Sequence, residues 1–133
     1  MKNECFLQLM DLYFEKCEFF QTRTDDNSDY NSSFQITYAL NSIDKSDVKV
    51  TIDTTVSNET SSISVTLRTV GIFKLDKGDL EQETYDHLLK ANTAAILFPY
   101  VRSQISLLTT QPGIKPVIIP PININALLSN SHD

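Results

Sequence analysis

Hydrophobic and polar residues alternate along three segments in the first half of the chain, at residues 34–40, 48–56 and 63–69. In the second of these, Val48, Val50 and Ile52 stand on one side of the alternation, with polar residues between them. A period of two predicts β-strands with one buried face. Because the polar connections between the three segments are short, they predict an antiparallel meander.

The first segment, residues 5–20, has a different pattern, since it carries apolar residues on both phases of the alternation. Leu7 and Leu9 fall on one phase, whereas Leu12 and Phe14 fall on the other. This pattern predicts a strand that is covered on both faces. The polar loop that follows is long, so this strand need not pair with its neighbour in the sequence.

The hydrophobic period changes to that of helices after about residue 79. Asp79 and Gln82 resemble a capping box and predict a short helix over residues 80–90. A new cap at 92–94 then predicts a main helix from about Ala94 to Thr110, with Pro99 near its beginning, where a proline is tolerated. The apolar stripe of this helix consists of Leu97, Val101, Ile105 and Leu108.

Four of the five prolines fall between residues 112 and 121. Because proline cannot donate a hydrogen bond to a strand ladder, the apolar segment 113–124 is predicted to be extended without being a central strand. Two hypotheses follow: the segment caps the core, or it lines a groove for an apolar ligand or chain. A short final helix is predicted to begin near Asn123 or Asn125.

The composition narrows the class of protein. A chain of 133 residues is predicted to form a single domain, residues 1–133, and its net charge of −6 argues against binding to nucleic acid. No signal peptide and no membrane-spanning run is evident, so we expect a cytoplasmic protein without membrane insertion. Cys5 and Cys17 are interpreted as reduced, packed thiols, in preference to a disulfide or a metal site.

Candidate catalytic chemistry is weak. Asp86 and His87 are adjacent on a predicted helix, where neighbouring side chains diverge, so we interpret them as a solvated face. Arg102 is a candidate for binding an anion or for pairing with a nearby carboxylate. The acidic loop that contains Asp25, Asp26 and Asp29 lacks the spacing of a calcium-binding loop. We therefore expect no enzyme activity, no cofactor and no bound metal.

Four motifs along the chain resemble one protein family. They are YFEKCEFF at 13–20, GIF at 71–73, ILFPYVR at 96–102 and PININALL at 121–128. In their order and spacing they are similar to the SecB export chaperones. This resemblance implies an α+β fold, in which a four-stranded antiparallel sheet is followed by a long helix and a short C-terminal helix.

The resemblance also implies an activity and an assembly. SecB proteins hold non-native polypeptides in apolar grooves without ATP, and they assemble as a homotetramer, a dimer of dimers. The residues then expected to bind client chains are Phe34, Ile36, Tyr38, Phe73, Leu88, Ile118, Ile119, Ile122, Ile124 and Leu127. The residues then expected at the oligomer interface are Leu12, Phe14, Leu97, Val101, Ile105 and Leu108.

The resemblance leaves two kinds of client open, namely unfolded preproteins and an antitoxin. Family members that serve export dock on SecA through acidic residues of the sheet, but the matching positions here are Lys16, Phe20 and Thr66. Only SNSHD follows Leu128, so we expect the extension that meets SecA to be absent. Both departures favour protection of an antitoxin over handover to SecA. A structural or adaptor module that binds one folded partner is the alternative from another class.

Overall fold

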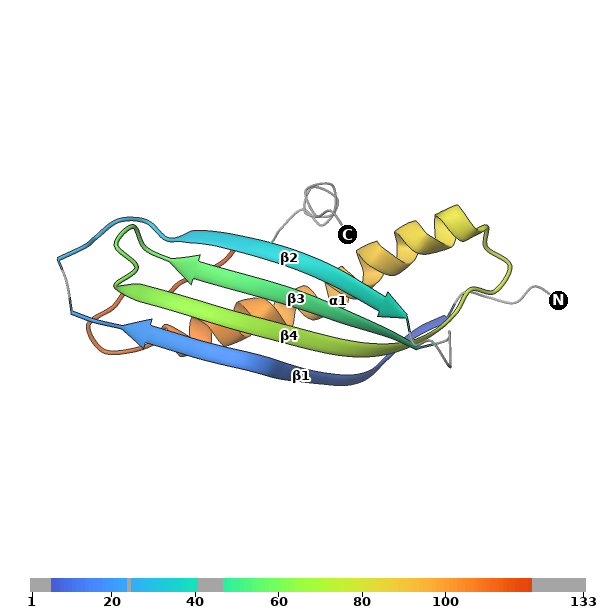
Figure 1. Cartoon of the computed structure of the whole chain (residues 1–133), viewed down its shortest axis with the longest axis horizontal. Coiled ribbons are helices and arrows are strands. Elements are labelled where there is room, and N and C mark those ends of the chain that lie inside the picture. The colour runs from blue at the N-terminus through green and yellow to red at the C-terminus, as the bar shows by residue number, and fades with distance from the viewer. Residues whose placement is uncertain (1–5, 24, 41–46, 121–133) are drawn as a thin grey trace.

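The computed structural model describes residues 6–23, 25–40 and 47–120, which form one antiparallel sheet and one helix (Figure 1). The strands are β1 (Phe6–Gln21), β2 (Asn31–Leu40), β3 (Asp47–Ser57) and β4 (Ile63–Asp76), and the helix is α1 (Gln82–Leu108). The predicted sheet and its following long helix are therefore confirmed. The predicted short C-terminal helix lies outside the described residues.

The strand order across the sheet is β1-β4-β3-β2, and every neighbouring pair is antiparallel. The predicted meander of β2, β3 and β4 is confirmed, and β1 pairs with β4 instead of β2. Helix α1 lies across one face of this sheet, which we call the inner face (Figure 1). None of the elements that the structure describes covers the other, outer face.

The half-buried apolar residues of β1 fall on both phases of the alternation because its pairing with β4 has two irregularities. The register shifts between Leu9 and Asp11 and again between Phe14 and Lys16. Each extra residue moves the following side chains to the opposite face of the sheet. As a result, the half-buried positions of β1 all lie on the inner face; they are Leu7, Leu9, Leu12, Phe14 and Phe19. Within this chain α1 covers the inner face of β1, and cover on the outer face stays a prediction.

Helix α1 is continuous, so the prediction of two successive helices was wrong. Thr93, expected near a helix start, is buried in mid-helix, where its hydroxyl donates to the carbonyls of Leu89 and Lys90. This back-bonding satisfies a threonine hydroxyl inside a helix. The N-cap residue is Glu81, whose side chain makes no capping hydrogen bond, so the N-cap lies two residues beyond the predicted Asp79.

Pro99 lies inside α1 and not near its beginning. Proline cannot donate to the carbonyl four residues earlier, which here belongs to Ala95. Both Pro99 and Ala95 are exposed, so the carbonyl that loses its donor is at the solvent-facing side of the helix. The proline is therefore tolerated where water can replace the missing hydrogen bond.

The core forms where the apolar stripe of α1 meets the inner face of the sheet. Leu97, Val101 and Ile105 are each fully buried within this single chain. The helix approaches β4 so closely at Gly71 that an added Cβ would lie 2.6 Å from Leu97 Cδ2 and 2.9 Å from Phe73 Cε1. The glycine of the GIF motif is thus required by the contact between helix and sheet.

These contacts correct the predicted oligomer interface for its three fully buried residues, and the half-buried ones stay predictions. Leu97, Val101 and Ile105 have no exposed surface to offer a second chain, because the chain's own sheet covers them. The other three residues of that prediction pack half-buried against the same core; they are Leu12, Phe14 and Leu108. The helical stripe was identified correctly, but it faces the chain's own sheet.

Candidate functional site

The segment after α1 turns back along the helix and forms one side of the candidate site. We call residues 111–120 the strap. Gly113 adopts a φ of +83°, a left-handed conformation that favours glycine, as the strap reverses direction. The segment beyond Pro120, including the predicted client residues Ile122, Ile124 and Leu127, lies outside the described residues.

Two polar side chains of α1 and that of its C-cap residue, Thr109, bind the backbone of the strap. Arg102 Nε donates to the carbonyl of Ile119 at 2.8 Å, and Ser106 Oγ donates to the carbonyl of Val117 at 3.1 Å. The amide of Val117 donates to Thr109 Oγ1 at 2.8 Å. The three positions are four and three residues apart and therefore share one face. They supply the hydrogen bonds that a strand ladder would otherwise provide.

Arg102 therefore has a role that the sequence did not reveal. We expected it to bind an anion or to pair with a carboxylate, but its Nε binds a backbone carbonyl. Ser106 and Thr109 were not identified either. The signal that would have found all three is their polar spacing along the helix just before a proline-rich segment.

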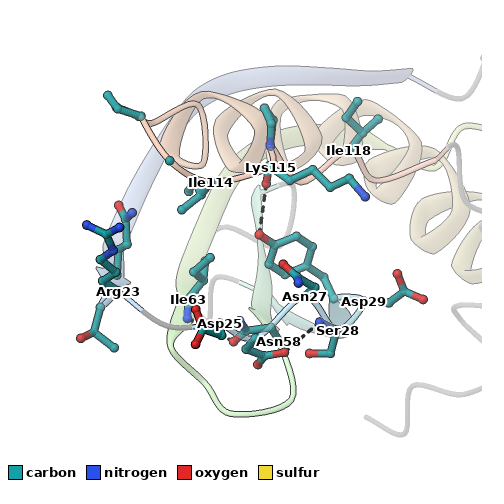
Figure 2. A pocket seen from close by; sticks show the side chains of 17 residues that line it. Arg23, Asp25, Asn27, Ser28, Asp29, Asn58, Ile63, Ile114, Lys115 and Ile118 are labelled. Carbon is teal, nitrogen blue, oxygen red and sulfur yellow. Dashed lines mark hydrogen bonds between the residues drawn. The ribbon is translucent and has the colours of Figure 1, made fainter.

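Tyr30 holds the strap from the opposite side. Its hydroxyl donates to the carbonyl of Lys115 at 3.1 Å, the dashed line that ends on Lys115 in Figure 2. Burial raises the pKa of the Tyr30 hydroxyl, and the nearby charge of Asp26 raises it further. The hydroxyl therefore stays protonated and remains a donor at neutral pH.

Side chains of the strap alternate in and out, as expected for an extended segment. Val117 and Ile119 are each 5 % exposed and belong to the core, whereas Ile118 between them is 80 % exposed. The first hypothesis is therefore confirmed for Val117 and Ile119, while the second stays a prediction for Ile118. Of the two strap residues predicted to bind clients, Ile119 fills the core and Ile118 is accessible.

An open cavity of about 1170 Å³ lies between the strap, the loop after β1 and the start of β4 (Figure 2). Its apolar lining comes mainly from the strap and consists of Tyr30, Ile63, Pro112, Ile114, Pro116 and Ile118. Its charged lining comes mainly from the loop and consists of Arg23, Asp25, Asp26, Asp29 and Lys115. The cavity thus combines one apolar wall with one predominantly acidic wall.

Asp26 fixes the acidic wall to the turn between β3 and β4. Its carboxylate accepts hydrogen bonds from the Ser28 amide at 2.8 Å, the Thr60 amide at 3.0 Å and Thr60 Oγ1 at 2.6 Å. Hydrogen bonds from Ser28 and Thr60 hold the pKa of this carboxyl well below its usual range. Asp26 therefore acts as a structural acceptor. No group of three or more potential metal ligands gathers within residues 6–23, 25–40 and 47–120.

Most of the other predicted client residues are engaged with the helix or buried. The Phe34 ring lies 5.0 Å from that of Phe98, and the Tyr38 hydroxyl donates to the Lys90 carbonyl at 3.0 Å. Lys90 Nζ also lies 5.7 Å from the centre of the Tyr38 ring. These two residues of β2 therefore keep only part of their surface accessible.

Ile36 and Phe73 are core residues, which corrects their assignment to client binding. Both point to the inner face, where α1 and the neighbouring strands cover them. Leu88 is half-buried on α1. The alternation in the sequence located their face correctly, but it could not show how completely the helix covers it.

A second cavity of about 700 Å³ lies at the opposite end of the sheet, beside the start of α1. Its lining includes Phe6, Leu40, Leu75, Tyr85 and Leu89. Phe6 and Leu40 are exposed apolar residues at strand ends, and the sequence analysis did not select them. Exposure at a strand end depends on the neighbouring connections, which alternation alone does not specify.

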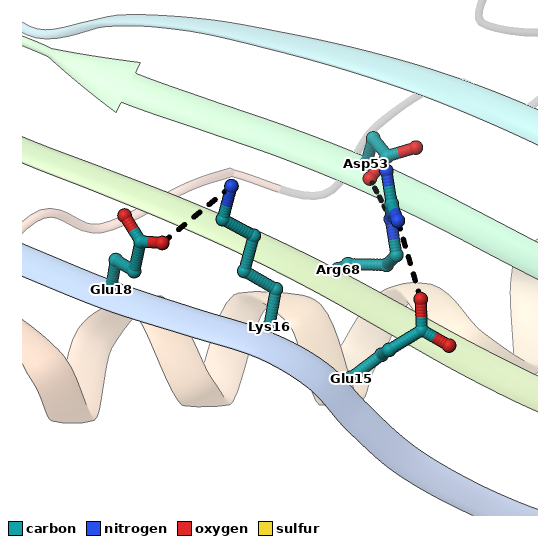
Figure 3. A network of polar contacts seen from close by, with 5 residues as sticks. All are labelled: Glu15, Lys16, Glu18, Asp53 and Arg68. Atoms are coloured by element: carbon teal, nitrogen blue, oxygen red, sulfur yellow. Dashed lines mark hydrogen bonds and ion pairs between the residues drawn. The ribbon is translucent and has the colours of Figure 1, made fainter.

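The outer face carries the positions compared with the SecA-docking acids. Arg68 pairs with Asp53 at 2.7 Å and with Glu15 at 3.2 Å, while Lys16 pairs with Glu18 at 3.5 Å (Figure 3). Hydrogen bonds from Arg68 to Asp53 and Glu15 raise the pKa of Arg68. The acidic side chains in this part of the face are therefore paired with cations.

Two further predictions concern single side chains. Cys17 is a free thiol, but it is exposed instead of packed, and it accepts a long contact of 3.5 Å from Gln104 Nε2. His87 is exposed, and its neighbour Asp86 accepts a hydrogen bond from Gln82 Nε2 at 2.7 Å. Within the part of the chain that the structure describes, no helix has the length and apolar character needed to cross a membrane.

Known proteins resemble this chain in both sequence and fold. The chain is 33 % identical over 87 residues to the protein-export protein SecB of Neisseria meningitidis serogroup A and covers 58 % of its length. It is 31 % identical over 98 residues to that of Methylobacillus flagellatus, which spans 71 % of this chain and 61 % of the relative.

Among solved structures, the Mycobacterium tuberculosis Rv1957 SecB-like chaperone superposes with a TM-score of 0.70. The match covers 88 % of each chain at 15 % identity, and that structure is a complex with a ChAD peptide from the Rv1956 HigA1 antitoxin. The family model described as preprotein translocase subunit SecB matches residues 6–133. This match spans nearly the whole sequence, and the chain therefore belongs to the SecB family.

Proposed function

We propose that this protein is a holdase that binds non-native polypeptides without using ATP. Membership of the SecB family points to this class of activity. The feature of the chain that carries the proposal is the open cavity of about 1170 Å³, into whose lining the strap places the 80 % exposed Ile118. An exposed apolar side chain beside an open cavity is suited to apolar segments of an unfolded chain.

Two kinds of client compete within this proposal, preproteins and an antitoxin. The outer face supports the second, because Lys16 and Phe20 stand where docking acids are expected and Arg68 pairs with the acids nearby. The solved SecB-like relative that holds an antitoxin peptide points the same way. We therefore favour protection of an antitoxin in the cytoplasm, with handover to SecA as the competing role.

We still propose a homotetramer, but with different contact residues. β1 is an edge strand of 16 residues, and its free edge is suited to pairing with another chain. On α1, Ile96, Tyr100 and Leu107 are exposed large apolar residues. We propose these residues and the β1 edge as assembly contacts in place of the buried stripe. Sizing-column analysis of Leu107→Asp tests this, because an unchanged tetramer would exclude Leu107 from the interface.

An aggregation assay tests the holdase activity. A chemically denatured client is diluted into buffer with excess protein, and light scattering is followed over time. We expect the wild-type protein to suppress scattering and Ile118→Asp to suppress it less, because a charge would stand in the apolar wall. Ala39→Asp, at an exposed position of the outer face, is the matched control. Unsuppressed scattering with the wild-type protein would contradict the proposal.

A pull-down from the native host separates the client classes. Recovery of one small antitoxin without SecA would support a dedicated protector. Recovery of many precursors together with SecA would support an export role with a rebuilt docking face. Recovery of a single folded protein, with no binding to denatured clients, would favour the adaptor alternative.

A further inference from the structure

The hydrogen bonds that hold residues 115–119 of the strap follow a single rule. In each of four hydrogen bonds, the strap contributes a backbone atom and the rest of the chain contributes a side chain. The backbone atoms belong to Lys115, Val117 and Ile119. The side chains that bind them are those of Tyr30, Arg102, Ser106 and Thr109. Such hydrogen bonds do not depend on which side chains the bound segment carries.

The side chains of the strap add only a simple apolar pattern. Val117 and Ile119 are buried at alternate positions, and Ile118 between them points away from the core. Any extended polypeptide with apolar residues at positions i and i+2 presents the same arrangement. The place occupied by residues 117–119, which we call the seat, is therefore shaped for a class of segments and not for one sequence.

Few interactions hold the strap in the seat. It has no ladder partner among the described strands, and Pro116 and Pro120 on either side lack the amide hydrogens that could anchor it further. Its position depends on hydrogen bonds and two apolar side chains that another extended chain could reproduce. Extended segments that bind through their main chain and through alternate side chains are an established mode of peptide recognition.

We propose that the seat is a binding site for an extended client segment with apolar residues at alternate positions, and that the strap occupies it as an internal competitor. This inference rests on the proposed holdase function and names how one segment of a client is held. In this arrangement the apparent affinity for a client is reduced by the fraction of time for which the strap is seated.

The test changes only the strap and leaves the seat intact. The probe is a fluorescein-labelled peptide with the sequence of residues 114–120, Ile-Lys-Pro-Val-Ile-Ile-Pro, and binding is measured by fluorescence anisotropy. In the variant Val117→Ser/Ile119→Ser the strap loses its apolar side chains, so we expect the peptide to bind about tenfold more tightly or better. Unchanged or weaker binding overturns the inference, because a purely structural strap would give one of those results.

Two further variants complete the test. Val117→Ile/Ile119→Val preserves the combined apolar volume, so affinity is expected to equal that of the wild-type protein. Adding Ser106→Ala to the double-serine variant removes a donor of the seat and is expected to weaken the peptide again, whereas no weakening overturns the location. If circular dichroism shows that the double-serine variant does not fold, Val117→Ala replaces it, with a smaller gain in affinity expected.

The outcome is distinguishable from failure of the holdase proposal. Suppression of client aggregation by the wild-type protein, without any gain in peptide affinity in the strap variants, refutes the seat and leaves the holdase function standing. Absence of suppression by the wild-type protein and by the strap variants refutes the holdase function, and the inference falls with it.

Discussion

Helix α1 and the strap cover the same face of the sheet by different physical means. The helix satisfies its backbone internally and buries a continuous stripe that includes Leu97, Val101 and Ile105. The backbone of the strap is hydrogen-bonded by side chains at the end of the helix and by Tyr30. The strap buries only two side chains. The helix is therefore a permanent part of the core, whereas the strap is a part that a client segment can replace.

The largest expected effect concerns the permanent part. Leu97→Ala should lower the free energy of unfolding by about 3–5 kcal/mol, because it leaves a cavity in a fully covered site. Urea denaturation measures the change. His87→Ala is the control, since His87 lies on the same helix and is exposed, and its effect should be much smaller. Equal losses at the two positions would mean that the helix does not pack as described.

Gly71→Ala tests the same contact from the side of the sheet. The added methyl group would lie 2.6 Å from Leu97 Cδ2, so overpacking should cost about 1–3 kcal/mol. The double variant Gly71→Ala/Leu97→Ala removes the clash with the Leu97 methyl groups and leaves the close approach to Phe73 Cε1. Its loss of unfolding free energy should therefore be smaller than the sum of the two single losses. Additive losses would show that the glycine is needed for another reason.

The strap should respond more weakly than the helix. Ile119→Ala is expected to cost about 2 kcal/mol, the lower end for truncation of a buried isoleucine, because the strap can detach while the rest of the fold persists. Hydrogen exchange at the Val117 amide should accelerate, since this amide depends on Thr109 Oγ1. Ile118→Ala should change neither quantity appreciably. A loss at Ile119 as large as that at Leu97 would make the strap part of the permanent core.

The sequence predicted the inner face of the sheet well, because alternation directly reports which side of a strand is buried. It did not predict which face each β1 residue takes, because bulges next to Leu9 and Phe14 change the phase without any marker such as glycine. It also divided the helix, since Thr93 and Pro99 are residues that usually lie at helix ends. In both places tertiary packing overrides a local preference.

The candidate site was predicted only in part, for a related reason. The apolar character of the proline-rich segment pointed to the strap, but burial at Ile119 and exposure at Ile118 depend on how the segment lies on α1. The anchors of the strap, such as Ser106, are ordinary polar residues of a helix. Their role appears only when a segment without ladder partners lies beside them.

A smaller effect, an increase in the free energy of unfolding, is expected for a residue of the sheet that lies under α1. Thr69 is fully buried on the inner face, and its Oγ1 has no hydrogen-bond partner. Replacing an unsatisfied hydroxyl by a methyl group should be favourable, so Thr69→Val should raise the free energy of unfolding by about 1 kcal/mol. Thr109→Val is the contrasting control, because Thr109 Oγ1 binds the Val117 amide and the Ile105 carbonyl. Destabilisation by Thr69→Val would contradict the absence of a partner.

The smallest expected effect is a loss of folding stability at low pH, caused by protonation of Asp26 in the loop beside the strap. Hydrogen bonds from Ser28 and Thr60 lower the pKa of Asp26 from its ordinary 3.8, so the folded state favours the carboxylate. The resulting stabilisation is present above that ordinary value and is lost as the pH falls below it towards the lowered pKa. Asp26 is only half-buried, which keeps the effect small and sensitive to salt.

Asp26→Asn removes this titration and keeps one of the two accepting oxygens, whereas in the wild-type protein Oδ1 accepts from Ser28 and Oδ2 accepts from Thr60. Urea denaturation at a series of pH values from neutral to below 3.8 should therefore show a steeper loss of stability for the wild-type protein than for the variant. Hydrogen exchange at the Val117 amide reports the strap in the same samples. Because Asp26 fixes the loop that carries Tyr30, protonation should loosen the strap before the helix. Parallel stability curves for the two proteins would show that the Asp26 carboxylate does not stabilise this loop.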